Sequence, residues 1–590
     1  MNNEKIKKRG NVKSIREFVF NNLNVSSLED INNWFRKSYA NNYRIDKLSD
    51  AAQLTIKEKH RVAYIFGDYD VDGTSGTSIL YLGLKKAGFK NVNYLIPDRE
   101  LEGYGANMRM ANEVSPNSIV FFVDNGIACH EVIRYLKEKQ CIVIILDHHE
   151  AWINPNTKEI EYPDADIIID PCAIRNSADF DGYCGAGLAY RFIGELYSKC
   201  FPETEAKIET KKLQGLAAIG TICDVMSLHE ENYVIVRNGL KCLLNPNFCT
   251  MGLYALLSTY ELTERCSAQD IGYKIGPSIN SMSRLDGTGA LEVVKLLIYN
   301  TNNWPEALEM ANNLYQKNEL RKNLSKEGIE KANEIIENNQ LNKNKILLVY
   351  IPNIKEGLIG IIAGELAEKH HCPTIVFTDS SEEDILKGSG RSVGTFHMKE
   401  NLDKIAPLIL KYGGHKGAAG LSVQKKCFNQ FCSEFETNAD NYEVEDKDTL
   451  FYDLDISVEQ VADSIKELKM FEPYGEGHPI PVFRIKDFTV IQKYGEYKKI
   501  LGENKKHVKF YGIKNVEAIG FNLADDLEAY PKPKSLCIIG NLVENHFNGK
   551  VTNQINCDFI EVNEDNYQTT LANTLIEMAS QRNFNSSKNA

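Results

Sequence analysis

The chain lacks several features that would set it apart from ordinary globular proteins. No apolar stretch approaches the roughly 20 residues of a membrane-spanning helix, which excludes a helical membrane protein. The charged first residues are not followed by the apolar core of a signal peptide, so no secretory leader is expected. The 14 cysteines are scattered without a Cys-x-x-Cys pair, which argues against a disulfide framework and a structural zinc site. These absences predict a reduced, cytoplasmic protein.

A positive net charge, common in proteins that bind nucleic acids, is also missing. The 590 residues carry a net charge of −13, with 43% apolar and 25% charged residues. This balance does not exclude a nucleic-acid substrate, because association depends on the local potential and because cation-binding carboxylates inflate the acidic count. The length corresponds to about four domains of about 150 residues.

Alternating strand and helix patterns predict an α/β protein with two lobes and a C-terminal β-barrel. The second lobe starts with the apolar strand at 345–351, and a long amphipathic helix from Pro305 joins the lobes. The apolar face of that helix is expected to carry Leu308, Ala311, Tyr315, Leu320 and Leu324. The predicted parts are a helical N-terminal appendage (1–50), a catalytic α/β domain (51–240), a helical connector (241–340), a second α/β lobe (341–442), a linker (443–470), a small barrel (471–565) and a polar tail (566–590).

Acidic clusters in the first 230 residues carry most of the functional information. They are Asp68-x-Asp70-x-Asp72-Gly73, Asp124-Asn125-Gly126, Asp147-His148-His149, Asp170-Pro171 and Cys223-Asp224. Three of them follow apolar runs, at 62–66, 119–123 and 142–146, which predict buried parallel strands. Because the carboxyl ends of parallel strands share one edge of a sheet, the acids should converge there. Such crowding of negative charge requires a cation.

The first cluster has two interpretations. Its alternating carboxylates point to one side just after a strand and can bind an ion, but an aspartate before Thr74 can equally cap a helix. A calcium loop of the EF-hand type is excluded, because its twelfth position needs a glutamate and is Ile79 or Tyr81 here.

The other clusters favour a metal site in combination. Asp124 alone is equally a strand-end turn, and Asp224 alone is equally a helix cap or half of a buried ion pair. Two adjacent histidines beside Asp147 at a strand end favour metal binding more strongly. Oxygen and imidazole donors without cysteine suit Mn²⁺ or Mg²⁺ better than structural zinc. Two such ions, about 3.5–4 Å apart, would support hydrolysis of a phosphoester or phosphoanhydride.

The order of these motifs resembles the DHH phosphoesterase superfamily, and within it the bacterial exonucleases specific for single strands. The resemblance covers residues 60–565 and implies a parallel-sheet DHH domain, a DHH-associated domain and a C-terminal OB-fold. It implies that the metal ligands are Asp70, Asp72, Asp124, His148 and Asp224. The implied catalytic set is His149, Asp68 and Asp147, with His149 holding the scissile phosphate or protonating the leaving oxygen.

The second lobe contains two glycine-rich loops, at 388–392 and 413–420. Each loop combines backbone N–H groups with a basic side chain and can bind phosphate. Each loop alone is equally an ordinary turn, and each isolated arginine equally a surface ion pair. The resemblance implies that a terminal phosphate of the substrate is bound by Arg99, Asn280, Arg284, Ser389, Arg391, Gly413, Gly414 and His415.

Lysines alternate with aromatic residues in the predicted barrel, as in grooves that bind single strands. The candidate nucleic-acid contacts are Lys498, Lys499, Lys505, Lys506 and Lys509. A solvated hairpin is the alternative. Three positions depart from the family pattern: Lys355 and Glu365 in the second lobe, and His478 at the start of the barrel.

The resemblance implies a cytoplasmic, monomeric exonuclease that degrades single-stranded DNA from the 5′ end with Mn²⁺ or Mg²⁺, in repair or recombination. Its expected partners are single-stranded DNA, single-strand-binding protein and helicases. Two alternatives stay open: a phosphodiesterase or pyrophosphatase for small molecules or short oligonucleotides, and a non-catalytic replication factor that binds single strands.

Overall fold

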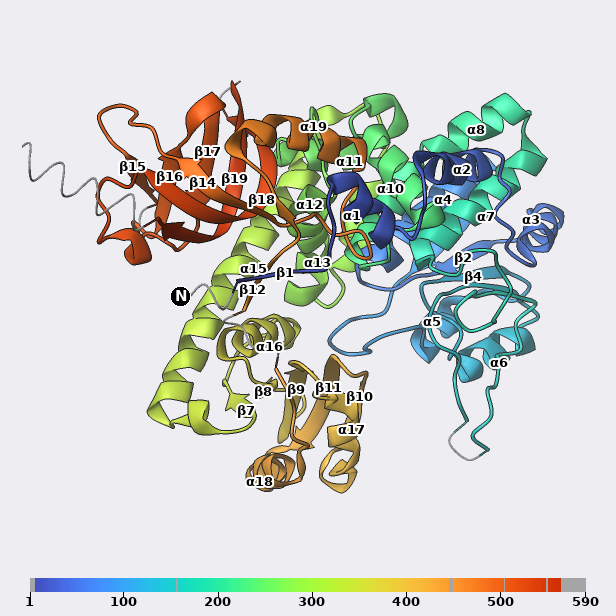
Figure 1. The fold of residues 1–590 in the computed structure, drawn as a ribbon. Helices are drawn as coiled ribbons and strands as arrows, with labels where there is room; N and C mark the ends of the chain where they lie inside the picture. The colour runs from blue at the N-terminus through green and yellow to red at the C-terminus, as the bar shows by residue number, and fades with distance from the viewer. Residues whose placement is uncertain (1–5, 155–156, 445–448, 503, 548–549, 564–590) are drawn as a thin grey trace, which may run out of the picture. The chain divides into compact units, whose positions relative to one another are not determined.

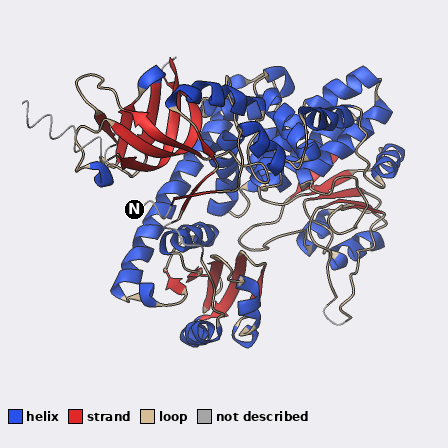
Figure 2. Cartoon of the chain, in the orientation of Figure 1, coloured by secondary structure: helices blue, strands red, loops and turns tan. Residues whose placement is uncertain are grey.

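The computed structural model describes two compact units, drawn in Figures 1 and 2. The described residues are 6–154, 157–444, 449–502, 504–547 and 550–563. The larger unit comprises Asn32–Glu445, and the smaller unit joins the N-terminal residues up to Ile31 with the chain from Asp446 onward. The predicted polar tail, 566–590, lies outside the described residues. Across the described ranges, no helix has the length and apolarity needed to cross a bilayer.

A five-stranded parallel sheet in the order β3-β2-β4-β5-β6 is the centre of the first lobe. Its strands are β2 (Ala63–Phe66), β3 (Val92–Leu95), β4 (Ile119–Val123), β5 (Ile142–Leu146) and β6 (Ile167–Ile169). The parallel strands predicted from the three apolar runs are confirmed, and only the first begins one residue later than expected.

Alternate side chains of these strands pack on opposite faces of the sheet. On β4, Phe121 and Val123 belong to the core cluster of one face, whereas Val120 and Phe122 belong to that of the other. The first face is covered by α4 (Val71–Lys86), α7 (Gly185–Cys200) and α9 (Gln214–Cys223), and the second by α5 (Met108–Glu113) and α6 (His130–Glu138) (Figure 1). Coverage of both faces explains why the strands are apolar throughout.

The helical region after residue 240 shares the core of the first lobe. Leu253, Ile271 and Val293 lie in the same hydrophobic cluster as Phe121 of the sheet. The remaining helices of the first lobe and this region are α2 (Leu28–Tyr39), α3 (Leu48–Lys57), α8 (Glu203–Lys211), α10 (Glu230–Leu243), α11 (Met251–Thr259), α12 (Ala268–Asp270), the π-helical turn η3 (Ile271–Ile275), α13 (Gly276–Leu285), α14 (Ala290–Ile298) and α15 (Trp304–Asn338). The connector is therefore built into the catalytic lobe.

The long helix predicted from Pro305 is α15, which spans 35 residues, but its buried face is only partly the expected one. Tyr315 and Leu320 are 37% and 46% exposed. The buried face instead carries Ala307, Ala311, Leu314, Asn318, Ser325, Gly328, Ala332 and Ile336. Small residues let the helix lie close to its neighbours, and Asn318 is accommodated because its Nδ2 donates to the Tyr260 hydroxyl, 3.1 Å away.

The second lobe contains a five-stranded mixed sheet in the order β10-β11-β9-β8-β7. Its strands are β7 (Leu347–Tyr350), β8 (Thr374–Asp379), β9 (Ile385–Arg391), β10 (Lys411–Gly414) and β11 (Ala418–Gln424), with helices α16 (Glu356–His370), α17 (Met398–Asp403) and α18 (Phe428–Asn438). Only β7 and β8 are parallel. Both predicted glycine-rich loops belong to β-structure, because β9, β10 and β11 include most of their residues.

The smaller unit is built on a seven-stranded sheet in the order β13-β14-β18-β19-β17-β16-β15. Its strands are β13 (Leu454–Asp455), β14 (Phe483–Thr489), β15 (Lys498–Leu501), β16 (His507–Tyr511), β17 (Val516–Gly520), β18 (Ser535–Phe547) and β19 (Lys550–Val562). An isolated bridge between Val490 and Gly512 joins the chain after β14 to the chain after β16. Because these strands are not neighbours in the sheet order, the bridge curls the sheet toward a barrel.

Two expected boundaries differ from the structure. The expected linker at 443–470 contains β12 (Leu450–Tyr452), β13 and α19 (Val461–Met470). The expected N-terminal appendage is divided, because its first strand, β1 (Ile6–Lys8), pairs in parallel with β12, and α1 (Ile15–Asn22) belongs to the same smaller unit. Pairing between residues more than 400 positions apart leaves no local pattern in the sequence.

Candidate functional site

The first acidic cluster lies where β2 passes into α4. Asp68 is buried, and Asp70 caps α4 by accepting a hydrogen bond from the Gly73 N–H at 2.9 Å. Asp72 follows in the first turn of the helix. The helix cap and the ion-binding cluster are compatible interpretations of these residues. Asp70 caps the helix, and the cap points the carboxylates toward the other acids.

Asp72 is held by the start of a second helix. Its carboxylate accepts hydrogen bonds from the N–H groups of Gly185 and Ala186, at 2.6 and 2.9 Å. The unpaired N–H groups of a helix N-terminus favour such an anion. A Cβ on Gly185 would lie 2.6 Å from the Cβ of Asp124, so glycine lets these two acidic segments meet.

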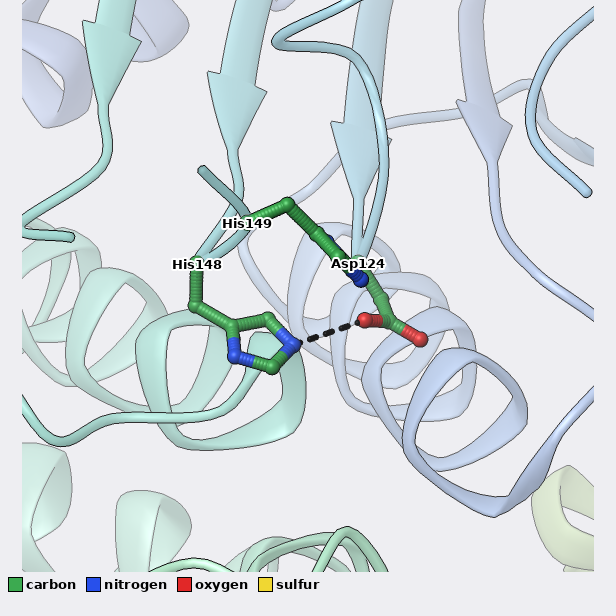
Figure 3. A group of neighbouring side chains, drawn as sticks. All are labelled: Asp124, His148 and His149. Atoms are coloured by element: carbon green, nitrogen blue, oxygen red, sulfur yellow. Dashed lines mark hydrogen bonds and ion pairs between the residues drawn. The ribbon is translucent and has the colours of Figure 1, made fainter. Parts of the chain in front are cut away.

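Asp124 and His148 contact each other at the ends of neighbouring strands β4 and β5 (Figure 3). The His148 Nε2 lies 3.0 Å from an Asp124 oxygen, 3.6 Å from Asp224 and 3.7 Å from Asp72. Asp124 has a φ of +61° and Val225, next to Asp224, a φ of +55°. Such a conformation costs on the order of 1–3 kcal/mol for a non-glycine residue and is typical of functional sites.

Among the residues that the structure describes, three groups of donor atoms can each hold a metal ion. They are Asp124–His148–His149, Asp72–His148–Asp224 and Asp68–Asp70–Asp124, and the atoms of each group lie within 4.8 Å of one another. All five predicted ligands and Asp68 therefore converge, although they come from sequence positions as distant as 68 and 224.

The electrostatics of this cluster fit a divalent cation. Among the described residues, the ion-pair partners of Asp72, Asp124 and Asp224 are all histidines, and one buried oxygen of Asp68 accepts no hydrogen bond. Burial and the neighbouring carboxylates raise the pKa of Asp68 and Asp124 well above the usual range and raise the pKa of Asp224 to about 8. Bound cations offset the unfavourable energy of several buried carboxylate charges. The oxygen and imidazole donors suit Mn²⁺ or Mg²⁺.

Asp147, one of the predicted catalytic residues, contacts His149. It is fully buried, and its two oxygens accept hydrogen bonds from the N–H groups of Ile127 and His148 and from Nδ1 of His149, at 2.7–2.9 Å. Burial lowers the pKa of His149, but the hydrogen bond to Asp147 and the charges of Asp147, Asp224 and Asp72 together raise the pKa to about 9. Asp147 therefore orients His149, and its predicted part in catalysis stays a prediction.

Tyr104 is a site residue that sequence reasoning missed. Its hydroxyl donates to the carbonyl of Asp124 at 2.8 Å and lies 3.0 Å from the His149 Nδ1. The only local signal is its place between Gly103 and Gly105, which both have positive φ. Asp170, at the end of β6, also lies near this network, and burial raises its pKa to about 7.

Five of the predicted phosphate-binding residues line one cavity of about 450 Å³. They are Arg99, Arg284, Ser389, Arg391 and Gly413, and Tyr104 lines the same cavity. Asn280, Gly414 and His415 are not among its lining residues. Burial and the nearby Arg99 lower the pKa of Arg284 to about 9, which indicates a concentration of positive charge suited to an anion.

Two glycines of α16 allow the second lobe to complete this cavity. A Cβ on Gly357 would lie 2.3 Å from the Arg284 carbonyl oxygen, and one on Gly360 would lie 2.9 Å from the Arg391 guanidinium. Arg391 also donates to the Ser389 hydroxyl at 3.2 Å. The helix can thus press against both arginines only because it lacks side chains at these positions.

The three departures from the family pattern lie outside the acidic cluster. Lys355 Nζ donates to the carbonyl of Leu285 at 3.0 Å, which ties α16 to α13. Glu365 is exposed on α16. His478 is buried, and its Nε2 lies 3.0 Å from the Phe471 carbonyl oxygen, so its contact is internal to the smaller unit.

The predicted nucleic-acid lysines are not equivalent. Lys499, Lys505 and Lys506 are exposed, and Lys499 lies opposite Lys509 across β15 and β16. Lys509 pairs with Glu517 at 2.5 Å, and Lys498 donates to the Leu527 carbonyl at 2.6 Å. The three exposed lysines are therefore the ones available to a phosphate backbone.

Three stretches of the chain match known domain families. Residues 62–221 match the DHH family, N-terminal domain, residues 343–440 match the DHHA1 domain, and residues 452–558 match the RecJ OB domain. The predicted fold class is confirmed. Fold and acidic cluster together define a two-lobed phosphoesterase of the DHH type with an OB domain.

Comparisons over the whole chain identify the particular family within this class of phosphoesterases. The single-stranded-DNA-specific exonuclease RecJ of Haemophilus influenzae is 30% identical over 550 residues, 89% of this chain and 92% of the relative. The crystal structure of Thermus thermophilus RecJ with Mn²⁺ has a TM-score of 0.72 at 24% identity and covers 95% of this chain and 80% of that one. A crystal structure of exonuclease RecJ bound to manganese has a TM-score of 0.57 at 29% identity, over 68% of this chain and 96% of that one. The chain belongs to the RecJ family.

Proposed function

We propose that the chain is a metal-dependent exonuclease that degrades single-stranded DNA from the 5′ end, in DNA repair and recombination. The observation that carries the proposal is that the arginine-lined cavity adjoins the acidic cluster through Tyr104, which lines the cavity and contacts His149. A terminal phosphate in the cavity would bring a nearby phosphodiester to the acids. The relative from H. influenzae is named as specific for single-stranded DNA, which supports this substrate.

Two ions of Mn²⁺ or Mg²⁺ are the cofactors that fit the donor groups. Asp70, Asp72, Asp124, His148 and Asp224 would hold them, with Asp68 as a further ligand or a base. Bound there, the ions would neutralise charge on the phosphoryl oxygens and lower the pKa of the attacking water. The solved exonuclease RecJ at 29% identity is bound to manganese, which supports this assignment.

His149 serves the leaving group in this proposal. Its Nδ1 is held by Asp147, and 41% of its side chain is exposed, so the ring is oriented and still accessible to a substrate. We assign to it the holding of the scissile phosphate and the delivery of a proton to the leaving oxygen. The Tyr104 hydroxyl contacts the same ring and further restrains it.

The cavity accounts for polarity and end dependence. Arg99, Arg284, Ser389 and Arg391 would grip a 5′ phosphate, which fixes which phosphodiester lies at the acids and releases small products from one end. Specificity for single strands over duplex would follow from a path that admits only one strand and makes no base-specific contacts. We place the protein in the cytoplasm as a monomer, working with single-strand-binding protein and helicases.

A digestion panel tests this proposal. It uses single-stranded and duplex DNA and RNA, labelled at either end, with Mn²⁺, Mg²⁺ and EDTA. We expect release of the 5′ label from single-stranded DNA, no release with EDTA, and little attack on blunt duplex. Prior release of the 3′ label, or turnover of dinucleotides in place of long strands, would replace the proposal by a different polarity or by an oligonucleotide phosphodiesterase.

The Arg391→Ala variant should lose its preference for a 5′ phosphate. Arg391 lies in the cavity beside Ser389, and a hydrogen bond to a charged group contributes about 1.5–3 kcal/mol, so kcat/KM on 5′-phosphorylated strands should fall by about 10- to 150-fold. Turnover of 5′-hydroxyl strands should stay unchanged. Lys399→Ala, which replaces a side chain that is 43% exposed in the same lobe, is the control. An equal loss on both kinds of strand would remove Arg391 from the phosphate pocket.

Replacing Lys499, Lys505 and Lys506 together by alanine should weaken binding of long strands and reduce its salt dependence. Each phosphate contact to a single strand contributes about 0.7 to the slope of log K against log salt, so the slope should fall by about 2. Fluorescence anisotropy titrations over a salt series measure it. An unchanged slope would favour the interpretation of this region as a solvated hairpin.

A further inference from the structure

One helical segment runs past both halves of the proposed active site. The chain passes from α12 through the π-helical turn η3 directly into α13, which ends with Leu285. Between Ile275 and Leu285, the residues that are not buried are Pro277, Asn280 and Arg284. Together with Tyr273, they follow each other at spacings of four, three and four residues, which places them on one face of the segment. On that face Tyr273 is exposed, and the other three residues are half-buried.

Pro277 explains the π-helical turn that contains Tyr273. A proline within a helix has no N–H to donate, and its ring clashes with the carbonyl four residues earlier, which is that of Tyr273. The wider turn avoids this clash, and the Gly276 N–H instead bonds to the Ile271 carbonyl, five residues back. The Tyr273 side chain is 80% exposed. Single π-helical turns of this kind often occur at functional sites.

The segment is anchored next to the acidic cluster. A Cβ on Gly276 would lie 2.5 Å from the Cys223 Sγ, and one on Gly272 would lie 3.9 Å from the Ile222 side chain. These two residues end α9, and Asp224 follows them directly. At the opposite end of the face, Arg284 lines the phosphate cavity. Between them, the buried Oδ1 of Asn280 has no hydrogen-bond partner among the described residues, as expected of a group that awaits a ligand.

We propose that Tyr273 is a stacking platform for a base of the substrate strand on the 3′ side of the scissile bond. The proposal rests on the proposed exonuclease function. With the 5′ phosphate at Arg284 and the end of α9 packed against Gly272 and Gly276, a strand that follows this segment would pass Asp224 and extend toward Tyr273. Stacking on an aromatic ring tolerates every base, so it would hold the strand between successive cuts without sequence preference.

Tyr273→Ala should lower kcat/KM on long 5′-phosphorylated single strands by about 5- to 150-fold, the range that stacking of one base supports. Tyr273→Phe should keep near-normal rates, because the ring and not the hydroxyl makes the contact. Turnover of a 5′-phosphorylated dinucleotide should be the same in all variants, because so short a substrate does not extend to Tyr273. Tyr39→Ala, which removes another exposed tyrosine of the same unit, should leave all rates unchanged.

Abasic substrates identify the contact. A single abasic site is moved through the first eight nucleotides of a long strand, and kcat/KM is measured for the wild type and for Tyr273→Ala. At the contacted position the wild type should slow to the rate of the variant, and the variant should show no further loss. Equal rates of Tyr273→Ala and wild type on intact long strands would overturn the stacking role alone. Failure of the wild type to degrade single strands would instead overturn the proposed function.

Discussion

Asp124→Asn should reduce hydrolysis of single-stranded DNA by at least about a thousandfold, as loss of a group central to catalysis does elsewhere. Asp124 supplies an oxygen to two of the three donor groups and contacts His148 at 3.0 Å. Asparagine keeps the shape of the side chain but removes the charge that a divalent ion needs. End-labelled strands in saturating Mn²⁺ provide the measurement.

The same variant should be at least as stable as the wild type when no metal is present. Asp124 is 3% exposed, and burial and Asp72 raise its pKa, which means that its charge is unfavourable in the absence of a cation. Removing that charge should therefore keep or raise the melting temperature in EDTA. Asp164→Asn, on an exposed carboxylate of the same lobe, is the matched control. Near-normal nuclease rates for Asp124→Asn would refute the assignment of the metal centre.

Glu231→Ala should lower the free energy of unfolding by about 3–5 kcal/mol, because it leaves a buried charge without its partner. Glu231 and Arg191 are 1% and 4% exposed and form an ion pair, and Tyr183 donates a hydrogen bond to Glu231. Arg191 also donates to the Tyr43 carbonyl at 3.0 Å. Urea denaturation followed by circular dichroism measures the loss.

A double replacement separates the ion pair from the packing around it. Arg191→Met combined with Glu231→Leu should recover much of the lost stability, because apolar residues of similar volume often replace a buried pair at little cost. The exposed pair Lys207–Glu203 is the control, and Lys207→Ala should cost less than about 1 kcal/mol. If the double variant were as unstable as Glu231→Ala, the network would contribute through shape and not through charge.

The sequence pattern succeeds where the physical cause is local. Buried parallel strands are apolar throughout, and their ends are marked by acids, so β4 and β5 have the predicted bounds. The types of metal-ligand atom are also evident from short motifs. Oxygen and imidazole donors without a thiol indicate Mn²⁺ or Mg²⁺ before any contact is known. Glycine next to arginine similarly marks residues that line one cavity, although only part of the predicted set lines it.

The pattern fails where a residue's role depends on what packs against it. The buried face of α15 is set by small residues such as Ala311 and Gly328, whereas apolarity alone selected the exposed Tyr315. Asp147 carries the same carboxylate as the metal ligands, yet hydrogen bonds from three neighbours occupy it. Tyr104 carries no motif, and its contacts with Asp124 and His149 come from a loop folded across the strand ends.

The sequence by itself determined the strands, the acids that follow them and the type of metal these acids suit, because each depends on residues within a few positions of one another. Only the tertiary structure decided which acids lie close enough together to hold an ion, that His149 contacts Asp147 and Tyr104, and that Tyr273 lies on the same face as Arg284. The physical reason is that ligand distances, hydrogen-bond saturation and burial are properties of residues brought together from distant parts of the chain.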